Sequence, residues 1–311
     1  MSPANDEGAP AAAPSGSRDE THGPDHPRLS VIISCRNSAS TLGDTLESIV
    51  TQDYPGWWEL VVVDNGSRDA TSAVARRFAD RVEHFSLLVP PKPGFQAAGL
   101  NHGIEHSKGD YLVFLDSDDL VAPGYLTHMV KAMDDSPFVG GAMDVERLNP
   151  PWLVARRRTL QGDRIDLFCS YLPAVIGASM SARREAVEAV GGFDEALPTQ
   201  HDLDISWRLH REGVKATFVP DAVLHYRYRD SLKAIFEQEV GYGEGEVALY
   251  RKFRGDGLKR RDVPHILVDW ARTLLALRGL RSLEGRARLL TLLGANLGRI
   301  KGSVKFRTLF L

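Results

Sequence analysis

The chain has 311 residues, of which 43% are hydrophobic and 25% are charged, an ordinary globular composition with ample length for one large domain. Two distant cysteines, Cys35 and Cys169, exclude a cysteine metal site and favour a reduced, cytoplasmic chain. No stretch of about 18 apolar residues occurs, so no transmembrane helix is expected. The formal net charge of −3 hides an asymmetry, because residues 251–311 carry 15 Lys and Arg against 4 Asp and Glu.

The first 28 residues differ in composition from the rest of the chain. They are rich in Pro, Ala, Gly and acidic residues and contain almost no large apolar side chains. They also lack the basic start and apolar core of a signal peptide. We therefore expect residues 1–28 to form a disordered leader.

Strands and helices are expected to alternate from Leu29 onward. Short β-branched, apolar runs predict buried strands, and apolar residues at helical spacing predict the helices between them. The predicted strands cover residues 29–34, 58–63, 85–89 and 111–115, and the predicted helices begin near residues 41, 71 and 96. This alternation is typical of an α/β fold with a parallel sheet.

Acidic residues follow two of these strands where each strand ends. Asp64 follows the second strand, and Asp116, Asp118 and Asp119 follow the fourth. Ligands bind at the carboxyl ends of such strands, and the loop of residues 34–37 should lie on the same edge. Carboxylates there suit Mg²⁺ or Mn²⁺ together with a substrate phosphate. Taken alone, the acidic run fits a solvated turn equally well. The chain has neither the dinucleotide fingerprint nor a P-loop.

Several separated motifs together resemble glycosyltransferase family 2, in the family's order, over roughly residues 29–230. The resemblance implies a GT-A fold, in which a nucleotide half (about 29–120) and an acceptor half (about 121–230) share one mostly parallel sheet. It also implies transfer from a nucleoside diphosphate sugar with inversion at the anomeric carbon. The motifs that carry it are Val61–Thr71, Asn101–Ile104, Gly109–Asp119, Gly191–Glu195 and His201–Leu209.

The resemblance assigns the donor and metal residues by position. Asp116 and Asp118 match the Asp-x-Asp motif, with Asp118 as the stronger metal ligand, and His225 matches a third ligand of Mn²⁺ or Mg²⁺. Asp64 matches the acid that contacts the base or ribose. The nucleotide-sugar site is expected to include further residues of the first loop and the following helices: Ser34, Arg36, Asn37, Gly94 and Asn101.

The acceptor side is assigned to a helix that begins near His201. The resemblance makes Asp202 the general base, which takes the proton of the attacking hydroxyl. The plainer alternative is that Asp202 only caps the helix, which would contribute about 1 kcal/mol to stability. Asp204, Trp207 and Arg208 are expected on the acceptor side. His201 stands where relatives usually have Glu. Another helix is expected to begin at about Ser181.

Residues 231–311 are expected to form a basic, amphipathic helical extension. Gly241–Gly245 are expected to be a mobile segment, followed by two apolar helical stripes. Such helices can lie on an anionic membrane or pack on the domain with a solvated basic face, and the sequence leaves both open. The stripes are Ile266, Leu267, Trp270, Leu274 and Leu277, then Leu289, Leu293, Leu297 and Ile300.

These features predict a non-processive, hexosyltransferase-like enzyme that moves a sugar to a hydroxyl acceptor, a lipid-linked or cell-surface glycan precursor. The Gln-x-x-Arg-Trp motif of processive relatives is absent. The enzyme is expected in the cytoplasm, with the inner face of the membrane as an alternative. A non-catalytic nucleotide- or sugar-binding module and a sugar nucleotidylyltransferase are the competing functions, although the first loop is poor in Gly for the latter. No nucleic acid partner is expected, since no such motif occurs.

Overall fold

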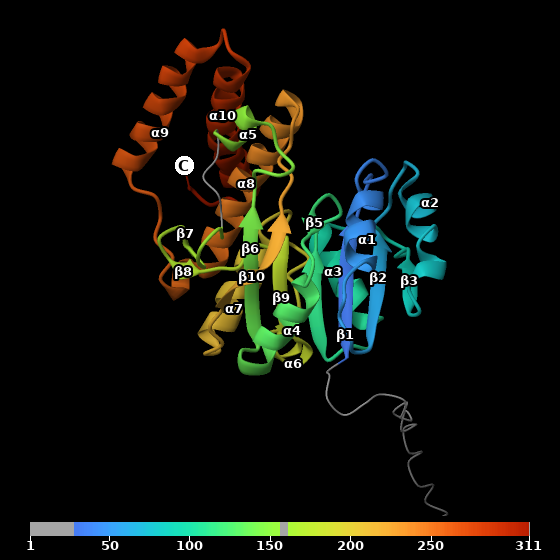
Figure 1. The fold of residues 1–311 in the computed structure, drawn as a ribbon. Coiled ribbons are helices and arrows are strands. Elements are labelled where there is room, and N and C mark those ends of the chain that lie inside the picture. Colours follow the sequence, from blue (N-terminus) through green and yellow to red (C-terminus); the bar gives the residue numbers. More distant parts are fainter. Residues whose placement is uncertain (1–27, 156–160, 311) are drawn as a thin grey trace, which may run out of the picture.

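The computed structural model describes residues 28–155 and 161–310, so the expected leader lies almost wholly outside the described residues. One 8-stranded sheet organises them, in the order β3-β2-β1-β4-β9-β6-β10-β5 (Figure 1). The strands are β1 (Leu29–Cys35), β2 (Trp58–Asp64), β3 (Phe85–Leu88), β4 (Tyr111–Leu115), β5 (Leu120–Val121), β6 (Phe138–Asp144), β9 (Ser179–Arg183) and β10 (Thr217–His225). The mostly parallel α/β sheet expected from the sequence is confirmed.

The first half of the sheet is parallel, and helices cover both of its faces. Strands β3, β2, β1 and β4 run parallel, with Ile33 beside both Val62 and Leu115. Alternate residues of β1 therefore enter different clusters: Ile33 packs with α1 (Leu42–Val50) and α2 (Thr71–Arg76), and Ile32 packs with α3 (Gln96–Glu105). Burial on both faces explains why these strands read as continuous apolar runs.

The acceptor half contains a strand that the sequence did not predict. The helix expected to begin at Ser181 begins instead at Arg184, and Ser179–Arg183 form β9, antiparallel between β4 and β6. The prediction was wrong because this strand is short and contains just two apolar residues, Met180 and Ala182, which alternate with the fully buried Ser179 and Ser181 and do not form a continuous apolar run. The other elements here are α4 (Tyr125–Asp135), α5 (Pro151–Val154), α6 (Arg184–Ala189), α7 (His201–Arg211) and the small hairpin of β7 (Leu167–Phe168) and β8 (Leu172–Pro173).

Three long helices follow β10. They are α8 (Leu232–Phe253), α9 (Val263–Ala276) and α10 (Leu283–Lys305), and the single 3-10 turns are η1 (Ala79–Arg81), η2 (Arg254–Asp256) and η3 (Leu277–Gly279). The glycines expected to form a mobile segment lie inside α8, so that expectation was wrong. A Cβ on Gly243 would collide with the Ala295 carbonyl and one on Gly298 with the Val240 carbonyl, so the glycines allow α8 and α10 to pack closely.

Among the described residues, none of the helices has the length and apolar character needed to cross a membrane.

Candidate active site

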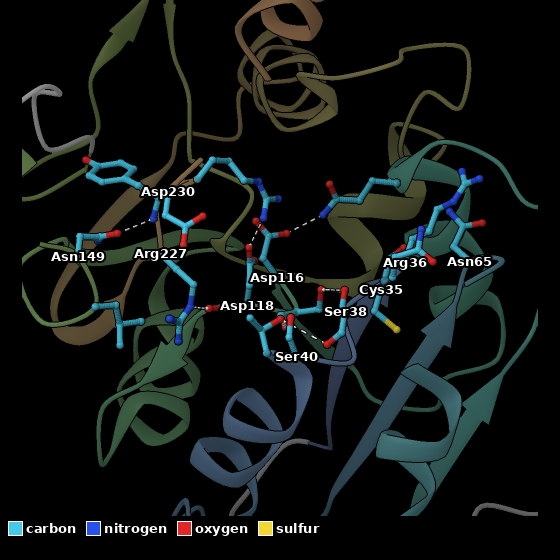
Figure 2. A pocket seen from close by; sticks show the side chains of 18 of the residues that line it. Cys35, Arg36, Ser38, Ser40, Asn65, Asp116, Asp118, Asn149, Arg227 and Asp230 are labelled. Atoms are coloured by element: carbon cyan, nitrogen blue, oxygen red, sulfur yellow. Dashed lines mark hydrogen bonds and ion pairs between the residues drawn. The ribbon is translucent and has the colours of Figure 1, made fainter. Parts of the chain in front are cut away.

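A cavity of about 760 Å³ lies at the carboxyl edge of β1 and β4. Figure 2 shows Asp116 and Asp118 near its middle, with Arg227 and Asp230 on one side and Arg36 and Asn65 on the other. The walls come from distant segments: the loop after β1, the loop before α3, the residues before α5 and the residues after β10. The parallel register of β1 and β4 brings the first loop and the acidic run together, as the sequence predicted.

Three carboxylates converge at the end of β4. Oxygens of Asp116, Asp118 and Asp119 lie within 4.8 Å of one another. Burial and then the charge of Asp118 raise the pKa of Asp116 to about 6. Burial and then the charges of Asp118 and Asp116 also raise the pKa of Asp119. Its Oδ2 is buried without a hydrogen-bond partner in the described part of the chain. A divalent cation held by this group would relieve the repulsion and satisfy that oxygen, so the residues fit such an ion.

Two arginines that the sequence did not assign to the site contact this acidic group. Arg229 donates to Asp118 Oδ2 at 2.6 Å, and Arg227 donates through its Nε to the carbonyl oxygen of Asp118 at 2.9 Å. Gln96 donates to Asp116 Oδ1 at 2.6 Å. The alternation of Tyr226, Arg227, Tyr228 and Arg229 just after a strand was the available signal. The arginines supply positive charge where a donor diphosphate would lie next to the acids.

The residues expected to hold the nucleotide separate into two groups. Ser34, Arg36, Asn37 and Gly94 line the cavity, whereas Asp64 and Asn101 do not. Asp64 accepts hydrogen bonds from Ser67 N at 2.8 Å and from the Ser72 hydroxyl, so it holds the turn after β2. Asn101 pairs with the backbone N and O of Phe193, each at 2.9 Å, and so joins α3 to the acceptor half.

Asn65, the neighbour of Asp64, lines the cavity instead. Its side chain donates to the Gly94 carbonyl at 3.1 Å and accepts from Gly94 N at 3.0 Å. This reciprocal pair of hydrogen bonds fixes Gly94, in the loop before α3, against the end of β2. Asn65 was not singled out from the sequence, although it belongs to the same motif as Asp64.

His225 lies outside the acidic group in this structure. Its Nδ1 lies 2.7 Å from Asp144 Oδ2, and its Nε2 lies 3.0 Å from Arg147 Nη1. Because Arg147 can only donate, Nε2 of His225 is the acceptor. The ring proton is therefore on Nδ1, which donates a hydrogen bond to Asp144. His225 would have to exchange these partners before it could bind a metal ion.

A second cavity, of about 290 Å³, contains Asp202. Asp202 Oδ2 accepts from Gly177 N at 2.9 Å and Oδ1 accepts from Leu203 N at 3.0 Å. Asp202 is the second residue of α7, and Gln200 occupies the N-cap position. Tyr228 lines both cavities, so they adjoin at this side chain. The other walls come partly from α8 and α10, through Glu239, Tyr242, Glu246 and Arg299.

The three residues expected beside Asp202 on the acceptor side line neither cavity: Asp204 and Trp207 are buried and Arg208 is half-buried. Asp204 is fully buried and pairs with Arg208 at 2.6 Å and Lys252 at 2.5 Å. Trp207 is also fully buried and donates to the Leu172 carbonyl at 3.1 Å. Arg208 further donates to two carbonyls of the loop after α6. This cluster anchors α7, which positions Asp202 at its first turn.

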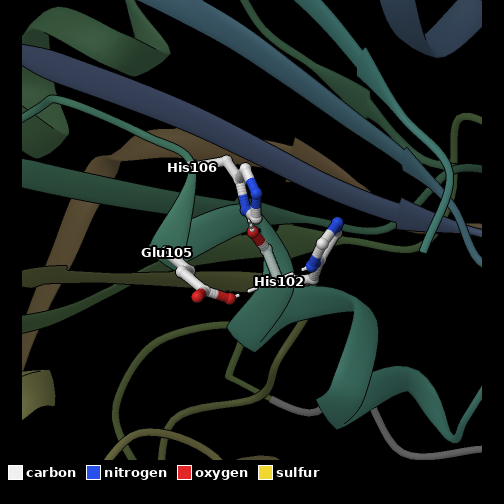
Figure 3. Close-up of side chains that lie close together, drawn as sticks. All are labelled: His102, Glu105 and His106. Atoms are coloured by element: carbon white, nitrogen blue, oxygen red, sulfur yellow. Dashed lines mark hydrogen bonds and ion pairs between the residues drawn. The ribbon is translucent and has the colours of Figure 1, made fainter. Parts of the chain in front are cut away.

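A second group of metal-ligand types lies on α3, where His102, Glu105 and His106 share one surface (Figure 3). The helix ends just before β4 begins, so the group lies toward the amino edge of the sheet. None of the three residues lines either cavity. Of these two groups, the acidic one after β4 is therefore the one that lies at the cavities, where it could hold a metal ion.

Sequence comparisons agree with this architecture. The profile described as Glycosyl transferase family 2 matches residues 30–191, and that of Glycosyl transferase family group 2 matches residues 111–293. Glycosyltransferase AglE of Haloferax volcanii is 26% identical over 227 residues, which cover 72% of this chain and 74% of AglE. The poly-beta-1,6-N-acetyl-D-glucosamine synthase of Staphylococcus aureus is 22% identical over 249 residues, which cover 77% of this chain but 60% of the synthase.

Solved structures share the fold. Mannosyltransferase PcManGT from Pyrobaculum calidifontis, in complex with GDP-Man and Mn²⁺, has a TM-score of 0.65 at 21% identity over 89% of this chain and 87% of its own. A fragment of Staphylococcus aureus TarS in complex with UDP-GlcNAc has a TM-score of 0.55 at 15% identity over 90% of this chain and 92% of its own. The fold is GT-A, and because the family profile spans more than half of the sequence, this chain belongs to glycosyl transferase family 2.

Proposed function

We propose that this glycosyltransferase moves one hexosyl residue from a nucleoside diphosphate sugar to a hydroxyl acceptor, with inversion and with Mn²⁺ or Mg²⁺. The observation that carries the proposal is that two cavities meet at Tyr228. Asp116 and Asp118 line the first cavity, and Asp202 lines the second. The first suits the donor diphosphate and the second suits the acceptor. The complexes of PcManGT with GDP-Man and of TarS with UDP-GlcNAc support a hexose donor.

The donor side would bind the nucleotide against the loop after β1 and the diphosphate beside the acids. Asp116, Asp118 and Asp119 would hold the cation, which supplies positive charge to the departing diphosphate. Arg229 now pairs with Asp118 at 2.6 Å. Its guanidinium can exchange this carboxylate for a phosphate oxygen when the donor binds, because both accept charge-assisted hydrogen bonds.

The acceptor side would perform the proton transfer. The acceptor oxygen forms a bond to the anomeric carbon while the bond from that carbon to the diphosphate oxygen breaks, and its electron pair leaves with the diphosphate. Asp202 takes the hydroxyl proton during this step. A single displacement on the face opposite the leaving group inverts the anomeric configuration. The Gly177 and Leu203 backbone N–H groups would hold the carboxylate in its orientation.

The charge of the second cavity favours a neutral hydroxyl over a phosphate as the attacking group. Besides Asp202, its walls carry Glu239 and Glu246, and Arg299, the one arginine among the described residues that line it, pairs with Glu246 at 2.6 Å. A phosphate placed among these carboxylates would be repelled. A lipid carrier or glycan attached to the acceptor sugar would then extend outside the cavity.

The proposal is tested by titration calorimetry of UDP- and GDP-sugars with and without Mn²⁺. We expect at least one donor to bind in the micromolar range only when Mn²⁺ is present. Asp118→Ala should abolish that binding, and Asp202→Asn should retain it. Failure of every nucleotide sugar to bind folded protein in the presence of Mn²⁺ would refute the proposal.

A further inference from the structure

Helix α9 exposes an apolar face. Val263, Leu267, Val268, Leu274 and Leu275, here called the α9 face, are between 46% and 64% exposed. Residues 263, 267 and 274 are spaced by four and seven, which places them on one side of the helix. The exposed surface continues through Leu277, Leu280 and Leu283 into the start of α10. Large apolar side chains gathered on one surface indicate an interaction site, in contrast to single exposed leucines.

The opposite side of α9 faces the protein and carries the polar residues Asp269 and Thr273 beside the half-buried Ile266 and Trp270. Asp269 pairs with Arg261 and lies 3.7 Å from Arg299 of α10. Thr273, the one buried residue of this described helix, accepts a hydrogen bond from Asn296 at 3.1 Å. A helix that packs on a domain in water normally buries its apolar side. Here the five apolar side chains of the α9 face are exposed instead, so an apolar medium suits this side of the helix.

Arginines surround the tip of the α9–α10 hairpin. Arg278, Arg281, Arg286 and Arg288, here called the basic rim, have no ion-pair partner in the described part of the chain, and Glu284 is the one acid between Leu277 and Arg288. A groove of about 360 Å³ between the two helices includes Arg272 and Arg288. Apolar residues beside unpaired arginines are the composition of helices that lie in the interface of an anionic bilayer.

We propose that the α9 face and the basic rim dock this protein on an anionic lipid bilayer. A second copy of the chain fits the same surface poorly. In a two-fold interface the patch meets itself, so the basic rim of one copy would lie close to that of the other and like charges would repel. Anionic headgroups instead neutralise the arginines, whose stems can lie along the apolar boundary while their charges remain in the headgroup layer.

Docking in this orientation would bring the acceptor cavity close to the lipid surface. Arg299 lines that cavity and also lies 3.7 Å from Asp269 on the inner side of α9, so the cavity and the α9 face lie on opposite sides of this one helix. Figure 1 shows α9 along the outer side of α10, away from the sheet. The docking proposal stands on the exposed helix and its charge alone, and it does not require the proposed transfer reaction.

Vesicle flotation of the full chain tests the proposal. We expect binding to vesicles of phosphatidylcholine with 30% phosphatidylglycerol, at least tenfold weaker binding to pure phosphatidylcholine, and partial loss in high salt. Leu267→Glu with Leu274→Glu should reduce binding at least tenfold, and Val89→Glu, an equally exposed apolar site near β3, should not. Arg278→Glu with Arg281→Glu should also reduce binding, whereas Arg76→Glu with Arg77→Glu on α2 should have little effect.

Two results would overturn the proposal. One is an absence of vesicle binding at low salt by folded wild-type protein. The other is a dimer in light scattering that the paired leucine substitutions dissociate while vesicle binding is unchanged or absent, since this would make a second copy the occupant of the α9 face. Circular dichroism checks that each variant keeps its helical content, which is expected because every altered side chain is exposed.

Discussion

Replacing Asp202 with asparagine separates its proposed chemical role from its structural one. The asparagine oxygen can still accept the Gly177 N–H bond, which is 2.9 Å long in the native protein, and only the 3.0 Å contact to Leu203 N must be lost. The cost in stability should therefore be about 1 kcal/mol. Loss of a general base lowers turnover by roughly 100- to 10,000-fold, which corresponds to about 3 to 5 kcal/mol of transition-state stabilisation.

Asp204→Asn on the same helix turn is the matched control. Asp204 is fully buried and pairs with Arg208 and Lys252. Its neutralisation should lower the free energy of unfolding by about 3 kcal/mol, near the lower end of the range for a broken buried ion pair. The loss is limited because Lys252 keeps a second partner, Asp194, at 2.6 Å. Turnover of the folded Asp204→Asn protein should change by less than about tenfold.

The assay combines urea unfolding with initial rates of nucleoside diphosphate release at a temperature where both variants are folded. Normal turnover by Asp202→Asn, together with reduced stability, would refute the general-base role and leave this carboxylate with its structural bonds to Gly177 and Leu203.

Four further outcomes are expected. EDTA should abolish transfer and added Mn²⁺ should restore it, and full activity in EDTA would contradict a role for metal at Asp118. Arg229→Met should weaken donor binding at least fivefold in calorimetry if its guanidinium moves to the diphosphate; unchanged affinity would exclude this. Burial alone would raise the pKa of Glu244, but hydrogen bonds from Lys301 and Lys305 hold that pKa below its usual 4.5. Glu244→Gln should therefore lower the free energy of unfolding by about 2 kcal/mol at pH 7. That difference should vanish in urea unfolding as the pH falls through the native pKa, because the wild-type carboxylate then gains a proton; a pH-independent difference would contradict the linkage. Gly99→Ala should lower stability by about 1 to 3 kcal/mol and weaken donor binding, because the new Cβ would collide with the Ser34 hydroxyl; unchanged unfolding would show that α3 can shift freely.

Local patterns predicted the strands that build the donor edge. The run Val61–Val63 and the run Leu112–Leu115 are buried on both faces, so their continuous apolar sequence identified them correctly. The same logic failed for β9, because this buried strand alternates Ser179 and Ser181 with Met180 and Ala182 and so has no continuous apolar run. The family resemblance was confirmed. The roles that it implies for the acidic run and for Asp202 stay predictions, although both lie at cavities that adjoin.

Contacts between distant segments could not be read from the sequence. Arg229 pairs with Asp118 across 111 positions. The helices expected to form a separate basic extension contribute Glu239, Glu246 and Arg299 to the cavity of Asp202. The outward orientation of the α9 face also depends on the contacts of Asp269 and Thr273 with α10, which helical periodicity alone cannot reveal.

The anomeric configuration of the first-formed product tests the central claim most directly. Proton NMR can follow the anomeric signal of a bound donor as it is consumed by wild-type enzyme with Mn²⁺, before mutarotation of any free sugar. A single displacement assisted by Asp202 predicts that the first product has the configuration opposite to the donor, and that Asp202→Asn forms it at a rate at least 100-fold lower. A first product with the donor's own configuration would contradict the mechanism.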